Sequence, residues 1–403
     1  MQSTRPNEFI ALIAVLTALV AMSIDTMLPA VGTMATELHA AQANDRQFVV
    51  LMFFLGLTFG QLVFGPLSDS IGRKPAIYSG LLIYGAGSLM CMFANNFETL
   101  MLGRLIQGFG AASPRVAALA MVRDGAKGAE MARIMSFVMS VFMLVPILAP
   151  SIGQVVLYVA NWRYIFGGLL VAATLAATWL HLRQAETLHP QDRRPISVAE
   201  LLDGAGQVVR NPVAMGYTLA SGFIFSAFTT YLGTSQQIFA EQYQQGDKFA
   251  LWFGGLAIAI ALAMVLNGKF VRTIGMRFIS KQALRGFIAV WSALLVLTVI
   301  YAGHPPLPLL GILLFGSFFC SGLLFGNFNA IAMEPMGHVA GMAAAISGFL
   351  SSLMAVVFGG IAGRLYDGTL FPITIAFLSF GVLMWLSTEW AERKRLVAQE
   401  SGA

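Results

Sequence analysis

The turn GPLSDSIGRKP, from Gly65 to Pro75, separates two long apolar runs of this chain. Its charged residues, Asp69, Arg73 and Lys74, stand between stretches that are each long enough to cross a hydrocarbon core of roughly 30 Å as a helix. Hydrophobic residues make up 57% of the 403 residues and charged residues only 11%, whereas soluble domains carry about 25% charged residues. The sequence therefore predicts an all-α membrane protein in which this turn lies at one membrane surface.

Apolar runs of similar length recur along the whole chain. They predict twelve transmembrane helices, at residues 8–31, 46–67, 76–94, 98–122, 130–156, 161–182, 212–239, 248–269, 280–302, 307–332, 340–363 and 371–390. The first run is too long for the core of a signal peptide and lacks a small-residue cleavage site, so we expect it to remain as a helix. The sequence thus predicts a six-helix bundle at 1–182, a cytoplasmic linker at 183–211 and a second six-helix bundle at 212–403.

The distribution of positive charge orients these helices. With the N-terminus inside, most Lys and Arg residues fall in the inner loops and tails, and the predicted outer side holds Arg46, Arg163, Lys248 and Arg364. Such a bias marks the cytoplasmic side. We therefore expect both termini in the cytoplasm and a multi-pass protein of the cell inner membrane. These loops account for the net charge of +5, and no basic stretch with interleaved aromatic residues predicts a nucleic-acid partner.

The turn from Gly65 to Pro75 has a counterpart in the second half of the chain. The stretch GKFVRTIGMRF, from Gly268 to Phe278, aligns with it, and Ile71-Gly72 then matches Ile274-Gly275. Each turn closes the second helix of a predicted six-helix half and carries clustered positive charge. This internal repeat predicts two related bundles, a layout in which transporters place the substrate site between the halves.

Charged residues also stand inside predicted helices. Asp25 lies in the first apolar run, and Arg104 and Arg115 lie in the fourth. Charged groups at membrane depth are costly and are usually functional. The two arginines are separated by about three helical turns, so they lie on nearly the same face. A rise of roughly 1.5 Å per residue places Asp25 and Arg104 at similar depth, and whether their faces meet stays open.

Several stretches, in order and spacing, resemble one family. They are DTMLPA (25–30), GPLSDSIGRKP (65–75), RLIQGFGAA (104–112), MVRD (121–124), RIMSFVMSVFMLVPILAPSIG (133–153), NWRYIF (161–166), MGYTLASGFIFSAF (215–228) and residues 334–348. Together they resemble the bicyclomycin-resistance type of drug exporters, often called Bcr/CflA, within the major facilitator superfamily. The resemblance implies twelve helices in two pseudo-symmetric six-helix bundles. It also implies drug:proton antiport of small amphiphilic compounds by alternating access, with protons as the coupling ion and no other cofactor.

The resemblance also implies roles for individual residues. Asp69, Arg73 and Asp124 would form a conformational latch at the cytoplasmic side. Asp25 and Arg104 would carry proton coupling, because burial favours the neutral form of a carboxyl group and a nearby cation favours the ionised form. The fifth helix resembles the family's antiporter motif in a degenerate form, with Ala149-Pro150 where Gly-Pro is frequent. The residues of this motif are Pro146, Pro150 and Gly153.

Candidate substrate contacts are chosen by helix position and by polar or aromatic character. They are Arg115, Gln107, Phe54, Tyr231, Gln236 and Asn329. The stretch TYLGTSQQIFAEQY, from Thr230 to Tyr243, departs from the family, which tends to have a Ser/Pro-Phe sequence there. Gln236 could therefore bind a polar ligand or cap the end of its helix.

An alternative transporter hypothesis stays open. The chain could be a proton-coupled symporter or a facilitator for a small metabolite such as a sugar or an organic acid, because an importer needs no antiporter motif. A membrane-embedded enzyme is disfavoured, since the sequence offers neither a Ser–His arrangement nor an intramembrane His pair. The five His and two Cys residues predict no metal site. No loop is long enough to form a partner domain, and we expect a monomer in the lipid bilayer.

Overall fold

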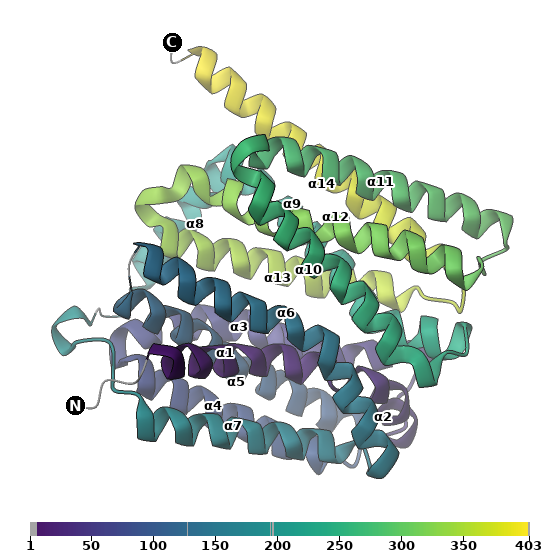
Figure 1. Ribbon diagram of the computed structural model, residues 1–403, viewed down its shortest axis with the longest axis horizontal. Helices are drawn as coiled ribbons and strands as arrows, with labels where there is room; N and C mark the ends of the chain where they lie inside the picture. The colour runs from purple at the N-terminus through teal and green to yellow at the C-terminus, as the bar shows by residue number, and fades with distance from the viewer. Residues whose placement is uncertain (1–5, 127, 194, 196, 402–403) are drawn as a thin grey trace. The chain divides into compact units, whose positions relative to one another are not determined.

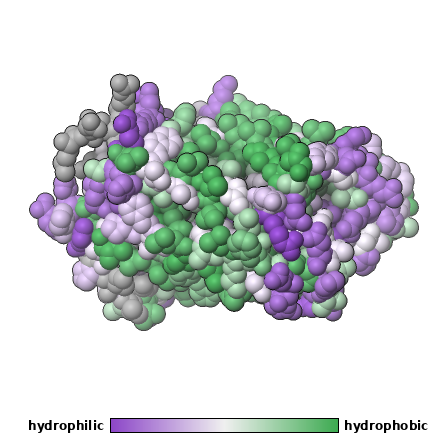
Figure 2. Space-filling model, turned by 90° about the horizontal axis from the view of Figure 1, so that it is seen from below, coloured by the Kyte–Doolittle hydropathy of each residue, from purple (hydrophilic) through white to green (hydrophobic). Residues whose placement is uncertain are grey.

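The chain is described by a computed structural model that covers residues 6–126, 128–193, 195 and 197–401. These residues form helices joined by connections that are mostly short, and no strand occurs among them (Figure 1). Within this part of the chain, twelve helices are long and apolar enough to cross a membrane. The predicted all-α class and the predicted helix number are confirmed. On the face that Figure 2 shows, hydrophobic residues cover the middle and hydrophilic residues gather toward the two ends.

The chain divides into two compact units, Met1–Ser197 and Val198–Ala403. The first unit contains α1 (Pro6–Asp25), η1 (Leu28–Ala30), α2 (Val31–Glu37), η2 (Ala43–Gln47), α3 (Phe48–Ile71), α4 (Arg73–Met92), α5 (Phe97–Gly125), α6 (Gly128–Val159), α7 (Arg163–Arg183) and η3 (Pro190–Asp192). The first membrane span is not one straight helix, as the sequence predicts for residues 8–31. It consists of α1, η1 and α2 in succession and reaches Glu37.

The second unit begins within the stretch predicted as a linker. It contains α8 (Val198–Arg210), α9 (Pro212–Gln236), the π-helical turn η4 (Gln237–Gln242), η5 (Gly246–Lys248), α10 (Phe249–Ile274), α11 (Met276–Ile300), α12 (Leu307–Met333), η6 (Glu334–Val339), α13 (Ala340–Arg364) and α14 (Phe371–Ser401). Helix α8 is amphipathic, and Val208 on its apolar side packs with Ala343 and Ile346 of α13. Residues 198–210 therefore belong to the second unit.

The last helix extends farther than predicted. The sequence predicts a helix at residues 371–390, whereas α14 continues to Ser401. The additional turns are rich in Glu, Lys and Arg, which are good helix formers. Their side chains also pair along the helix, with Arg393 Nε 3.3 Å from Glu389 Oε1 and Arg395 Nε 2.8 Å from Glu392 Oε2. The helix therefore continues beyond its apolar stretch.

The two units repeat one packing scheme. In the first unit α5 packs against both α3 and α4, α6 packs on α1, and α7 packs on α4. In the second unit the corresponding contacts join α12 with α10 and α11, α13 with α9, and α14 with α11. The matched turns also share their backbone, since Gly72 has φ +110° and Gly275 has φ +89°. The internal repeat predicted from the two turns therefore extends to the helices.

Glycine residues bring α3 and α5 into backbone contact. A Cβ atom on Gly56 would lie 2.0 Å from the carbonyl oxygen of Leu105, and one on Gly108 would lie 2.0 Å from that of Phe53. Small residues permit this close packing in membrane helices. Because Arg104 precedes Leu105 directly, the same contact fixes the height of Arg104 against α3.

Candidate functional site

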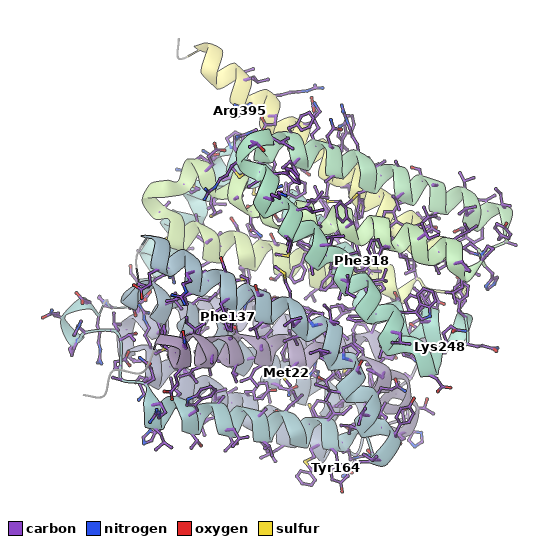
Figure 3. All side chains as sticks on the ribbon, viewed as in Figure 1. Met22, Phe137, Tyr164, Lys248, Phe318 and Arg395 are labelled. Carbon is purple, nitrogen blue, oxygen red and sulfur yellow. The ribbon has the colours of Figure 1, made fainter. Side chains whose placement is uncertain are left out.

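The first membrane span breaks directly after Asp25. The amide of Thr26 donates to the carbonyl of Met22 at 3.1 Å, and the chain then turns into η1, where the amide of Ala30 donates to the carbonyl of Met27 at 2.8 Å (Figure 3 marks Met22). Pro29 has no N–H group, so it cannot bond to the carbonyl four residues earlier, which is that of Asp25. Asp25 therefore ends a helix inside the bundle, where its side chain is only 4% exposed.

Arg104 of α5 binds the backbone of the same turn. Its Nη1 donates to the carbonyl of Ser23 at 3.1 Å, and its Nε donates to the carbonyl of Val49 on α3 at 2.9 Å. Its guanidinium carbon also lies 4.5 Å from the ring centre of Phe53. The last carbonyl groups of a helix carry partial negative charge, so this fully buried cation caps the end of α1.

The structure answers whether Asp25 and Arg104 meet. In the described part of the chain they form no ion pair, and Arg104 reaches the backbone two residues before Asp25 instead. No described residue donates a hydrogen bond to the Asp25 carboxylate. Arg104 Nη2 and Thr26 Oγ1 are also buried without a hydrogen-bond partner among these residues. The break therefore gathers polar groups that retain unused hydrogen-bonding capacity.

Gln107 continues this network into α4. Its Oε1 accepts from Arg104 Nη1 at 2.5 Å, and its Nε2 donates to Ser88 Oγ at 2.9 Å. The hydroxyl groups of Ser23 and Tyr84 lie 2.7 Å apart and complete the link back to α1. Gln107, predicted as a substrate contact, is fully buried and uses both ends of its amide inside the first unit.

The residues predicted as an antiporter motif lie on α6, beside the break. Pro146 and Pro150 stand inside α6, and Pro150 removes the amide that would bond to the carbonyl of Pro146. One turn later, a Cβ atom on Gly153 would lie 1.8 Å from the carbonyl oxygen of Thr26. The structure thus brings Gly153 against the residue that follows Asp25, a contact that sequence spacing could not predict.

The predicted latch residues also come together within the first unit. Arg73 Nε donates to Asp124 Oδ2 at 2.8 Å, and its Nη2 donates to Asp124 Oδ1 at 3.2 Å, a paired geometry that orients the guanidinium. Its Nη1 bonds to Asp69 and, at 3.1 Å, to Ser68 Oγ. Arg73 is only 6% exposed, so these carboxylates compensate a nearly buried charge.

The second unit contains a corresponding cluster that the sequence did not predict. Arg277 of α11 donates to Glu334 at 2.6 Å through Nη2 and to Glu392 at 2.9 Å through Nε. Tyr217 of α9 donates to the same Glu392 carboxylate at 2.9 Å. The signal that could have found it was the repeat itself, because Arg277 follows Gly275 as Lys74 follows Gly72.

The remaining predicted substrate contacts lie in different surroundings. Phe54 and Tyr231 are buried, and the Tyr231 ring packs against Phe318, with the two ring centres 4.6 Å apart. Arg115 is partly buried in α5 and Gln236 ends α9. Asn329 is exposed, and its amide donates to the carbonyl of Phe325 at 3.3 Å. In the described residues no group of three or more His, Cys, Asp or Glu side chains could hold a metal ion.

Comparison with known proteins identifies the family. Residues 13–360 match the family model of the Major Facilitator Superfamily. The chain is 30% identical over 355 residues to an uncharacterized MFS-type transporter, YdgK, of Bacillus subtilis (strain 168), covering 87% of each chain. It is 25% identical over 366 residues to a bicyclomycin resistance protein homolog of Haemophilus influenzae, covering 91% of each.

A solved structure shares the fold. The xylose transporter XylE from E. coli, in a partially occluded inward-open conformation, superposes with a TM-score of 0.70 at 14% sequence identity. The superposition covers 96% of this chain and 97% of XylE. The resemblance predicted from the sequence motifs is confirmed at the level of family and fold. This chain belongs to the major facilitator superfamily, whose members are membrane transporters and not enzymes.

Proposed function

We propose that this transporter is a drug:proton antiporter that exports small amphiphilic compounds by alternating access. The observation that carries the proposal is the carboxylate of Asp25, buried at the broken end of α1 on the turn that Arg104 binds. Low-dielectric surroundings favour the neutral form of a carboxyl group, and a nearby cation favours the ionised form. A group held between these two influences can release its proton when the surroundings change.

The proposed exchange uses that balance. Substrate entering from the cytoplasm would displace the proton from Asp25, and a proton entering from outside would displace the substrate. The break at Asp25 and its contact with Gly153 would let α1 and α6 rearrange together as the proton moves. Relatives whose names refer to resistance, such as the bicyclomycin resistance protein homolog, support small amphiphilic compounds as the substrate class.

Further parts of the proposal follow from charge and topology. Asp69, Arg73 and Asp124 would act as a cytoplasmic latch that opens once in each cycle. Arg115, Phe54, Tyr231, Gln236 and Asn329 stay proposed substrate contacts, while Gln107 would act through Arg104. We place both termini in the cytoplasm and the protein in the cell inner membrane as a monomer, with protons as its only coupling partner besides the substrate.

The test is proton-driven transport by the full chain in proteoliposomes, with chloramphenicol as the probe and an imposed pH gradient. Wild type should accumulate chloramphenicol against its gradient, and a proton uncoupler should abolish this. Asp25→Asn should lose accumulation while its thermal unfolding stays unchanged. Asp203→Asn, on the surface of α8, is the matched control. Normal accumulation by Asp25→Asn would sink the coupling role of this carboxylate.

The alternative is a proton-coupled symporter or a facilitator for a small metabolite. A symporter binds substrate and proton together, so the purified protein should take up protons when substrate is added. An antiporter should release protons when substrate is added. Measuring the pH change of a weakly buffered solution on substrate addition separates the two. A resistance screen in a host lacking its own exporters would identify further substrates.

A further inference from the structure

The segment that leaves α7 folds back onto the start of α4. Glu186, three residues beyond the end of α7, accepts a hydrogen bond at Oε1 from the amide of Arg73 at 3.0 Å. Its Oε2 accepts another from the amide of Lys74 at 2.9 Å. Its Oε1 also accepts from the amides of Thr187 and Leu188, at 2.9 and 3.1 Å. One carboxylate therefore holds two amides of α4 and two of its own segment.

These bonds supply what the first turn of α4 lacks. The first amides of a helix have no partner within the helix. The preceding residue is Gly72, which has no side chain to cap them, and its φ of +110° excludes most alternatives. A carboxylate at a helix N-terminus is favoured by the helix dipole as well as by the hydrogen bonds. Glu186 is thus the cap of α4, supplied by a residue more than a hundred positions later.

Two further bonds attach the same segment to the Arg73 cluster. Thr187 Oγ1 donates to Asp124 Oδ2 at 3.0 Å, and that oxygen also accepts from Arg73. On the other side, Lys74 Nζ donates to the carbonyl of Gln184 at 2.5 Å. Residues 184–188 therefore contact both the backbone that carries Arg73 and the carboxylate that binds it.

The second unit has a related arrangement at the corresponding place. Arg277 is bound by Glu334, directly after α12, and by Glu392 of α14. By the repeated packing, α12 corresponds to α5 and α14 corresponds to α7. Asp124 in α5 and Glu186 beyond α7 are the matching carboxylates of the first unit. In each half, carboxylates from the fourth and sixth helices, or from residues shortly after them, bind the start of the third helix. In the first unit Asp124 binds the Arg73 guanidinium and Glu186 binds the amides of Arg73 and Lys74, whereas in the second unit both carboxylates bind the Arg277 guanidinium.

We propose that Glu186 is a positioning residue of the transport cycle, an inference that rests on the proposed function of the Asp69, Arg73 and Asp124 cluster. Glu186 sets the backbone from which Arg73 reaches Asp69 and Asp124. It also fixes the first residues of the connection that leads to the second unit. The cluster of Asp69, Arg73 and Asp124 and residues 184–188 then move together. The latch opens only when the bonds within the cluster and the bonds of residues 184–188 to it break together.

The test compares Glu186→Gln with Glu389→Gln in the full chain. Glu389 lies on the last helix of the second unit, and it pairs with Arg393, which is largely exposed. With chloramphenicol as the probe in proteoliposomes, we expect Vmax of Glu186→Gln to fall about tenfold, as for the loss of one charge-assisted hydrogen bond, with KM unchanged. Hydrogen exchange should also accelerate at the amides of Arg73 and Lys74. Glu389→Gln should change neither quantity.

A second variant keeps the test decisive if Glu186→Gln folds poorly. Thr187→Val removes the bond to Asp124 and leaves the carboxylate of Glu186 in place, and it should also lower Vmax without changing KM. A wild-type Vmax in Glu186→Gln, or unchanged exchange at Arg73 and Lys74, overturns the proposal. So does a loss of thermal stability with KM and Vmax altered together, because that indicates a purely structural role. Absence of proton-driven transport in wild type counts against the proposed function, whereas unchanged amide exchange counts against Glu186.

Discussion

Arg104 and Ser23 are joined by a hydrogen bond of 3.1 Å, from the guanidinium Nη1 to the main-chain carbonyl. In a continuous helix this carbonyl would accept from the amide four residues later. Here the helix ends, and a buried arginine from α5 takes the place of that amide. Arg104 therefore positions the Asp25 carboxylate by binding the backbone next to Asp25. It does so without forming an ion pair with that carboxylate.

This relationship predicts different outcomes for two substitutions of Arg104. Arg104→Ala leaves the carbonyls of Ser23 and Val49 buried without their donor, so we expect a loss of roughly 2–3 kcal/mol of stability together with proton-driven export. Arg104→Lys keeps the charge but not the planar fork that reaches both carbonyls, so it should retain part of the transport. Transport in proteoliposomes and thermal unfolding measure the two effects.

The control for Arg104 is Arg393→Ala, which removes a cation from an exposed pair on α14 and should leave both quantities unchanged. If Arg104→Ala exports with wild-type coupling, Arg104 is only a packing residue of the first unit.

The close contact at Gly153 predicts that adding a single methyl group there lowers both stability and export. In Gly153→Ala the new Cβ atom would lie 1.8 Å from the carbonyl oxygen of Thr26, so α6 must move away from the break. Overpacking of this kind costs about 1–3 kcal/mol. We expect lower thermal stability and strongly reduced export, measured on the same purified protein.

Gly168→Ala is the matched control for Gly153→Ala. It adds the same methyl group to α7, where no heavy atom of a neighbouring element lies within 4 Å. Equal behaviour of the two variants would show that close contact between α6 and the break is unnecessary.

Two glycines of one motif should respond in opposite ways. Gly72 has φ +110° and ψ +161°, a conformation in which an alanine is strained by about 1–3 kcal/mol. A Cβ atom there would also lie 2.8 Å from Glu186 Oε2. Gly65 stands inside α3 with nothing within 4 Å of its Cβ position, so Gly65→Ala should be neutral or stabilising. Thermal unfolding of the two variants tests the contrast, and equal melting temperatures would contradict it.

Local patterns in the sequence predicted much of this fold. The apolar runs predicted twelve spans, and the match between the turns at Gly72 and Gly275 predicted the repeat, because both features depend on residues close together in the chain. The cluster of Asp69, Arg73 and Asp124 was named through a family motif. Helix bounds were less accurate where polar residues continue a helix beyond its apolar stretch, as in α14.

Contacts between distant residues could not be predicted in this way. Glu186 caps α4 across more than a hundred residues, and Gly153 contacts Thr26. No pattern in the sequence around these residues indicates either contact. Such pairs depend on which face each helix presents and on its height against a neighbour. The sequence placed Asp25 and Arg104 at similar depth. The bond from Arg104 to the carbonyl of Ser23, however, depends on the break of the helix at Asp25. Pro29 is compatible with such a break, but only the packing of the helices shows that it occurs there.

The amide pair of Asn267 and Asn327 provides the last prediction, a test of packing between α10 and α12. Each side chain donates to the other, at 3.0 and 2.9 Å, and Asn327 is 2% exposed. Asn327→Leu leaves the half-buried amide of Asn267 without its partner and should destabilise the protein by about 1–2 kcal/mol. The double variant with Asn267→Leu removes both polar groups and should recover part of that loss, because an unpaired amide in the helix interface costs more than an apolar side chain there. Asn329→Leu, on the exposed side of α12, should change stability little. Unfolding of wild type, Asn267→Leu, Asn327→Leu and the double variant in mixed micelles measures the coupling, and strictly additive losses would show that the two amides do not stabilise each other.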